Sequence, residues 1–322
     1  MAAALALLGA CKAKEGRSAN GGSSVQVSGE SQARAGQPQA ARSAASQSID
    51  WQRVGQAMGK AGSMQPGDVY KVSLPRSDLR VSVRGVQVKP ALALGSWVAF
   101  KATGSNEAMA MGDLVLTEDE VGPVMLKLRE GGIGQTAVHN HLLEESPRVM
   151  YMHIRAKGDP TKIAAAMHAA LASSKTPMDA GGGKGPAAGA LGLDTARIRR
   201  ALGYAGKVNG GVYQVSVPRA ETIHDEGMEV PPAMGVATAL NFQPTGGGKA
   251  AITGDFVLIA GEVDPVIQAL TSNGIRVTAL HSHMLTEEPK LYFMHFWAND
   301  DAAKLARGLR AALDKMNVEK TA

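Results

Sequence analysis

Apolar residues recur at helical spacing or alternate with polar ones along most of the chain, and this pattern predicts its elements. Trp51, Val54 and Met58 fall on one face of a helix predicted at Asp50 to Lys60. Alternation with a period of two then predicts a series of strands. These strands are expected at Val69 to Leu74, Leu79 to Val88, Ser96 to Ala102 and Ala108 to Leu116.

Two more helices complete this part of the chain. One is expected near Gly122 to Arg129, and another over "PTKIAAAMHAAL", from Pro160 to Leu171. Asp159 suits the cap before the second of these helices, and proline is well tolerated in a first helical turn. An antiparallel sheet with helices on one side of it belongs to the α+β class.

The whole series then occurs a second time. Three segments of the first half have close counterparts in the second half, at a separation of 142 or 143 residues. The pairs are "GDVYKVSLPR" (Gly67 to Arg76) with "GGVYQVSVPR" (Gly210 to Arg219), "MGDLVL" (Met111 to Leu116) with "TGDFVL" (Thr253 to Leu258), and "AVHNHLLEESPRVMYMHI" (Ala137 to Ile154) with "ALHSHMLTEEPKLYFMHF" (Ala279 to Phe296). This duplication predicts two tandem homologous repeats, each an antiparallel sheet with flanking helices.

Changes in composition mark the ends of the repeats. Residues 12–48 are rich in Gly, Ser, Ala and Gln, which is typical of a flexible tether. A second stretch rich in Gly, Pro and Ala predicts a linker at residues 176–192. We therefore expect repeat 1 at residues 49–175 and repeat 2 at residues 193–316.

The charge of the chain is concentrated in the tether. The 322 residues include 34 Lys and Arg against 29 Asp and Glu, a net charge of +5. Between Lys12 and Gln47, five basic residues face two acidic ones, so this stretch alone carries +3. Because the repeats are close to neutral, the composition argues against a nucleic-acid partner.

The single cysteine, Cys11, closes the short apolar run "LALLGAC". Leu8 to Cys11 resembles the lipobox of bacterial lipoprotein signals, in which the cysteine becomes the lipid-bearing N-terminus after cleavage. Residues 1–11 are therefore predicted to be a lipoprotein-type signal. It implies a membrane partner through lipid on Cys11, and a location in the bacterial cell envelope on its periplasmic or extracellular face. The alternative is an Ala-rich N-terminus with an incidental thiol.

Each repeat carries three histidines whose spacing places them on one face of a sheet. Residues two apart in a strand point to the same side, so His139 and His141 project together. A hairpin centred on Ser146 places His153 opposite His139, and directly opposed residues share a face. The same spacing, His281, His283 and His295, recurs in repeat 2.

Three neutral imidazoles are typical ligands of Zn²⁺ or Cu, and we expect each repeat to bind one such ion independently. The arrangement resembles the zinc site of carbonic anhydrases in geometry. Glu145 and its counterpart Glu287 are predicted on the histidine face, as a fourth ligand or as a catalytic base for a metal-bound water.

Other residues give alternatives to this site. Copper thioether ligation is a competing interpretation of Met150, Met152, Met284 and Met294, although methionine commonly fills gaps in a core. Arg76 and Arg219, each after a strand, can hold an anion or be charges at a hairpin end. His168 and His224 have no counterpart in the other repeat and are left out of the site.

The duplicated histidine segments behind a lipobox-like start resemble the LppY/LpqO-type bacterial lipoproteins, a family described mainly as a domain of unknown function. The resemblance spans Ile49 to Ala312. It implies an exported bacterial protein and supplies no catalytic assignment. Three functions stay open: an envelope protein that binds or buffers Zn or Cu, a zinc-dependent hydrolase-type enzyme that uses a metal-bound water, and a ligand-binding or structural module without metal.

Overall fold

The two repeats form two antiparallel sheets that face each other. The computed structural model describes residues 48–178 and 191–320. The first sheet has six strands in the order β1-β2-β5-β6-β9-β7, and the second has six in the order β10-β11-β14-β15-β18-β16. The identical order confirms the prediction of two similar α+β halves, each with an antiparallel sheet and flanking helices.

The elements follow one another in the same order in both halves. In the first half they are α1 (Trp51–Met58), β1 (Ser63–Gln65), β2 (Val69–Pro75), β3 (Ser82–Val83), β4 (Val86–Gln87), α2 (Pro90–Ala93), β5 (Gly95–Ala102), β6 (Ala108–Thr117), α3 (Glu118–Glu130), β7 (Gly134–His139), β8 (Glu145–Ser146), β9 (Val149–Gly158) and α4 (Pro160–Leu171). In the second half they are α5 (Thr195–Leu202), β10 (Gly206–Asn209), β11 (Val212–Val217), β12 (His224–Asp225), β13 (Met228–Glu229), η1 (Pro232–Met234), β14 (Thr238–Gly246), β15 (Lys249–Leu258), η2 (Ala260–Glu262), α6 (Val263–Ser272), β16 (Arg276–His281), β17 (Glu287–Glu288), β18 (Tyr292–Asp301) and α7 (Ala302–Leu313).

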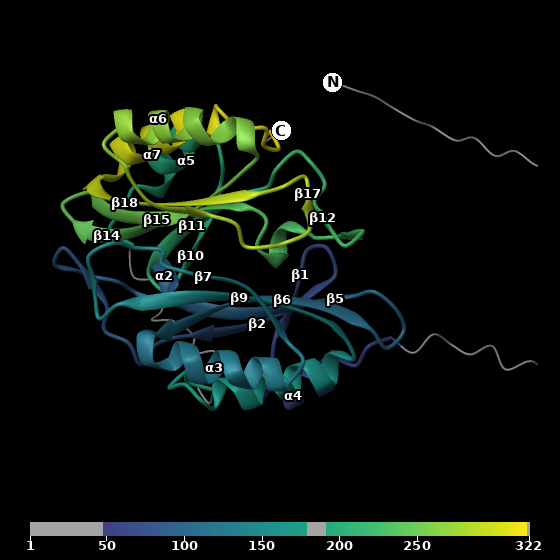
Figure 1. Cartoon of the computed structure of the whole chain (residues 1–322). Helices are drawn as coiled ribbons and strands as arrows, with labels where there is room; N and C mark the ends of the chain where they lie inside the picture. Colours follow the sequence, from purple (N-terminus) through teal and green to yellow (C-terminus); the bar gives the residue numbers. More distant parts are fainter. Residues whose placement is uncertain (1–47, 179–190, 321–322) are drawn as a thin grey trace, which may run out of the picture. The chain divides into compact units, whose positions relative to one another are not determined.

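The helices cover the outer face of each sheet, which leaves the two inner faces against each other (Figure 1). In β15, Ile252 and Phe256 belong to a core between sheet and helices, while Ala251 and Val257 belong to mixed clusters that join both halves. The strand is therefore apolar on both faces, as expected for a sheet that is covered on both sides. Within the described residues, no helix has the length and apolar character needed to cross a membrane.

The predicted helices and long strands are found close to their expected positions. The main difference lies at Leu79 to Val88, where one strand was predicted and a short hairpin of β3 and β4 is found. A three-stranded sheet, β4-β3-β8, uses this hairpin. The predicted signal and most of the tether and linker lie outside the described residues, and so does Cys11.

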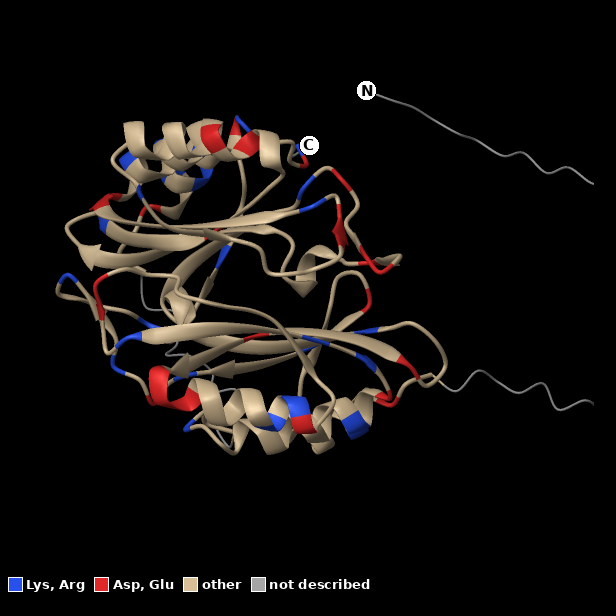
Figure 2. Cartoon of the chain, in the orientation of Figure 1, with Lys and Arg blue, Asp and Glu red and all other residues tan. Residues whose placement is uncertain are grey.

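Polar contacts tie the two halves into one compact unit. Lys89 donates its backbone N–H to Gln243 of the second half at 2.9 Å, and its Nζ donates to the Gly211 carbonyl at 3.1 Å. Elsewhere between the two halves, Glu144 accepts a hydrogen bond from Arg276 at 2.6 Å. The charged residues otherwise gather mainly on helices and loops, and the strands carry few of them (Figure 2).

Arg76 and Arg219 are buried structural residues, and neither alternative predicted for them, an anion site or a charge at a hairpin end, is found. Arg76 is fully buried, bonds Glu120 with two nitrogens at 2.7 and 3.1 Å, and also pairs with Asp78. Arg219 makes the corresponding contacts with Glu262, at 2.6 and 3.1 Å, and with Glu221. With their donors engaged inside the fold, these guanidinium groups are not available to an external anion.

Candidate metal centre

The histidines lie on or just beyond the edge strands β7 and β16, and on the neighbouring strands β9 and β18. His139 ends β7 and pairs with Tyr151 of β9, whereas the sequence predicted that it would oppose His153. His153 pairs instead with Ala137. The register differs from the expected one by two residues, and a shift of two keeps every side chain on its face. His139 and His153 therefore still share a face.

The six predicted histidines converge in one cluster. Their rings form three face-to-face pairs, and each pair joins the two halves. The centroid distances are 3.6 Å for His139–His281, 3.7 Å for His141–His295 and 3.6 Å for His153–His283. The expectation of two separate, independent sites is thus corrected, because folding brings the two sets of three together at the sheet interface.

The ligand atoms of these side chains lie close enough to hold a metal ion. Three groups have all their potential ligand atoms within 4.8 Å of one another. They are His139 with His281, His283 and His295; His139 with His141 and His153; and His141 with His295 and Asp255. The first and third groups mix residues from both halves, and shared members link all three groups.

The imidazoles are held so that one nitrogen faces the cluster without a partner. In all six rings, Nε2 is buried and makes no hydrogen bond within the described part of the chain. Nδ1 of His139 lies 3.2 Å from the Asn140 carbonyl, and Nδ1 of His295 lies 3.1 Å from the Gly254 carbonyl. A histidine that donates one ring N–H to a carbonyl is fixed with its other nitrogen ready to bind a metal.

Burial favours the neutral form of His139, His141, His153, His281 and His283. Burial, together with the positive charges that His281 and His295 would carry, lowers the pKa of His139 to about 3. Burial and the neighbouring His295 lower the pKa of His281 to about 4. For His141, His153 and His283, burial and the other imidazoles hold the pKa well below its usual value. Neutral imidazole is the form that ligates metals.

Two aspartates of the cluster were missed from the sequence. Asp255 Oδ1 lies 2.6 Å from His295 Nδ1, and Asp113 Oδ1 lies 3.8 Å from His153 Nε2. Burial raises the pKa of Asp113 well above its ordinary value, and the Asp255 carboxylate adds to this rise. For Asp255, burial acts in the same direction, but the charge and hydrogen bond of the adjacent His295, with the charges of His281 and His139, together outweigh burial and lower the pKa. The sequence contains a signal for both aspartates. Asp113 and Asp255 each interrupt an apolar strand, and they are 142 residues apart, like the corresponding histidines of the two repeats.

The two predicted glutamates are not brought to the imidazoles. Neither Glu145 nor Glu287 belongs to a group of close ligand atoms in the described residues. Glu145 leaves the β7–β9 pair and lies in β8, opposite Val83 of β3. Glu287 accepts a hydrogen bond from the Leu291 backbone N–H at 3.1 Å. A role for either one as ligand or base therefore has no support from the geometry.

The aromatic and methionine residues around the cluster are packing residues. The Tyr151 ring stacks on His141 with a centroid distance of 3.3 Å, and its hydroxyl group donates a hydrogen bond to the Ala93 carbonyl at 2.8 Å. The Phe293 ring stacks on His283 with a centroid distance of 3.6 Å. Met152 and Met294 lie in the cores under the helices. This placement excludes Met152 and Met294 as thioether ligands of the centre.

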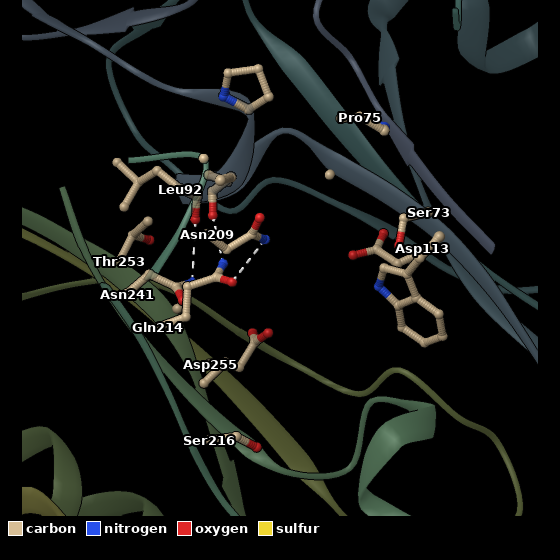
Figure 3. A pocket seen from close by; sticks show the side chains of 18 of the residues that line it. Ser73, Pro75, Leu92, Asp113, Asn209, Gln214, Ser216, Asn241, Thr253 and Asp255 are labelled. Carbon is tan, nitrogen blue, oxygen red and sulfur yellow. Dashed lines mark hydrogen bonds between the residues drawn. The ribbon is translucent and has the colours of Figure 1, made fainter. Parts of the chain in front are cut away.

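A cavity of about 1130 Å³ reaches one side of the cluster from between the two halves. His141, Asp113 and Asp255 line it together with polar residues of the second half. Figure 3 shows the carboxylates of Asp113 and Asp255 directed into the same space from different walls. Lys71 also lines it, and burial lowers the pKa of this amine to about 8 although Asp113 acts against the decrease.

Fold and site together define a duplicated α+β protein with a buried histidine cluster where its two copies meet. The family model described as "Domain of Unknown Function (DUF1259)" matches residues 52–173 and 196–315. The two matches cover well over half of the chain, which therefore belongs to this family and contains its domain in two tandem copies.

Comparisons with other proteins add little to this. None of the curated proteins compared with the chain matches it. A trimeric bacterial microcompartment shell protein, PduB, is 12% identical, with 78% of this chain and 88% of that chain covered and a TM-score of 0.19. EtuB from Clostridium kluyveri is 9% identical, with 78% and 90% covered and a TM-score of 0.18. Such low TM-scores support no conclusion about fold or function.

Proposed function

We propose that the protein binds transition-metal ions, Zn²⁺ or Cu²⁺, in a histidine centre that its two halves build together. The observation that carries the proposal is the convergence of six buried Nε2 atoms without hydrogen-bond partners. A buried polar atom without a partner is costly, so six of them in one cluster indicate a missing ligand. Imidazole nitrogens suit Zn and Cu better than Mg or Ca, which prefer oxygen.

The geometry favours a binding role over the two alternatives. A structural module without metal gains nothing from six stacked imidazoles whose Nε2 atoms are left unpaired, because apolar side chains would fill the space without that cost. A hydrolase in which Glu145 or Glu287 acts as base requires a glutamate beside the metal, and neither lies with the ligand groups. Binding or buffering of the ion is the function that the arrangement supports.

The wild-type protein is expected to take up Zn²⁺ at pH 7 and to release it as the pH falls from about 6.5 towards 3. Unfolded imidazoles take up protons near pH 6.5. His139 and His281 resist protonation until about pH 3 and 4 in the fold. Because the unfolded state binds more protons in this window, acid lowers the stability of the metal site and of the fold around it.

Metal content after dialysis against buffers of stepwise lower pH measures this release. Circular dichroism on the same samples separates loss of the ion from loss of the fold. Returning a sample to pH 7 with Zn²⁺ should restore the bound ion. A folded protein that holds no Zn²⁺ or Cu²⁺ at pH 7 after incubation with either would refute the proposed function.

We also propose that the protein is a lipid-anchored component of the bacterial envelope. Support comes from the sequence "LLGAC" and the tether behind it. Intact mass spectrometry of protein purified from its native membranes should show a chain that begins at Cys11 and carries lipid. Detection of a mature chain that retains Met1, or that begins at another residue, would contradict the anchor without affecting the metal site.

A further inference from the structure

The histidine cluster is nearly symmetric, but its two flanks have different surroundings. The duplication relates the His141–His295 pair to the His283–His153 pair by the offset of 142 residues. The first pair lies beside the cavity of about 1130 Å³, which His141 lines. The second pair meets a space of only about 20 Å³, which His153 and His283 line. One flank is thus open and the other is closed.

Side-chain exchanges between the repeats explain this difference. Around the closed flank, the first half supplies Trp97 and Met111, which line the small space together with Met234. The residues that correspond to Trp97 and Met111 in the second half are Ala239 and Thr253. Both of these smaller residues line the large cavity. The second repeat therefore leaves space where the first repeat fills it.

The walls of the cavity are rich in hydrogen-bond donors. Ser73, Ser216 and Thr253 bring hydroxyl groups, and Trp97 brings an indole N–H. Within the described residues, none of these four side chains makes a hydrogen bond, and Figure 3 draws none from the three of them that it labels. Lys71 adds an ammonium group that lies 3.8 Å from the centre of the Trp97 ring. Indole and ammonium groups can only donate, so the cavity suits a ligand with acceptor oxygens.

We propose that the open flank, made of His141, His295 and Asp255, is a metal position at which a small oxyanion from the cavity becomes a further ligand. This inference rests on the proposed metal binding. Two imidazoles and one carboxylate supply three ligands, and three-ligand metal sites keep a position for an external ligand. The cation attracts a carboxylate or a phosphate oxygen directly, and the donors of the walls can hold its remaining oxygens.

Charge and size also favour an oxyanion over an apolar or cationic ligand. Lys71 and Lys207 both line the cavity, on strands from different halves. With a divalent ion at the open flank, these ammonium groups and the metal together outweigh the charges of Asp113 and Asp255, the two carboxylates that line the cavity. A cavity of this volume accommodates a small organic acid or a phosphorylated molecule of modest size.

Cobalt-loaded full-length protein provides the test, because the visible spectrum of Co²⁺ reports changes in its ligands. Acetate and inorganic phosphate are titrated separately at constant ionic strength. At least one of them is expected to produce a saturable spectral change, and the two arms distinguish a carboxylate from a phosphate preference. If the protein retains cobalt and neither anion changes the spectrum, the oxyanion site is wrong while metal binding stands. If the protein retains neither cobalt nor, in a parallel sample, Zn²⁺ or Cu²⁺, the proposed function itself fails.

Thr253→Met tests whether the anion reaches the metal through the cavity. It places at the open flank the methionine that the first repeat has at the corresponding position, Met111. We expect unchanged cobalt content and an apparent anion affinity that is at least about tenfold weaker. Thr245→Met makes the same exchange at an exposed site outside the cavity and should behave as wild type. Ser216→Met, on the exposed inner side of β11, blocks the same space if Thr253→Met fails to fold. An unchanged anion response in both folded cavity variants would overturn the inference.

Discussion

Replacing His139 and His295 together by alanine is expected to abolish metal binding by the whole protein. His139 comes from the first half and His295 from the second, and every group of close ligand atoms contains at least one of them. After the double replacement, no group keeps more than two ligands. Loss of even an outer-shell partner typically weakens metal affinity by about 10- to 100-fold, so loss of these direct ligands should exceed about 100-fold. Metal analysis of the folded variant and Zn²⁺ titration measure the effect.

The matched control removes two other histidines of the same cluster. His281→Ala with His283→Ala leaves intact the group of His139, His141 and His153, and also the group that contains Asp255. This variant should therefore retain metal, at reduced stoichiometry. Equal losses in the two double variants would show that the groups do not bind separately, and retention of the ion by the His139/His295 variant would remove these residues from the centre.

Which histidines share a face could be predicted from the sequence, because side chains alternate between the two faces of a strand. The sequence placed His139 opposite His153, whereas the structure pairs His139 with Tyr151. An error of two residues leaves the face of each side chain unchanged. The three histidines of a repeat therefore share a face as predicted, although the predicted strand register was wrong. The prediction for Glu145 failed for a related reason. It assumed a simple hairpin, but β8 leaves that hairpin to pair with β3.

The joining of the two sets could not be predicted in the same way. Spacing within a repeat gives the histidine face of a sheet, but it does not say what covers that face. One sign was overlooked: in "AMAMGDLVL", from Ala108 to Leu116, residues on both faces of the strand are apolar apart from Asp113. Every residue of this segment is buried. A strand that is apolar on both sides lies between two layers, and here the second layer is the other repeat.

Glu120→Ala is expected to lower the free energy of unfolding by about 3–5 kcal/mol, the usual cost of breaking a buried ion pair. Arg76, which has no exposed surface, would lose two of its hydrogen bonds and keep only Asp78 as a charged partner. Glu120 also accepts the backbone N–H groups of Thr117 at 3.0 Å and Lys175 at 2.7 Å. It therefore holds together a strand end, the start of α3 and the segment after α4.

Glu130→Ala is the matched control in the same helix. Its carboxylate is about half exposed and, among residues 48–178 and 191–320, pairs only with Lys127, so its loss should change the free energy of unfolding by less than about 1 kcal/mol. Urea denaturation of both variants without metal gives the comparison. Because the inner faces of the two sheets are packed together, unfolding of the first half exposes apolar surface of the second, and a single shifted transition is expected for Glu120→Ala. A fall of less than about 1 kcal/mol for Glu120→Ala would show that Asp78 alone is sufficient to neutralise the buried guanidinium.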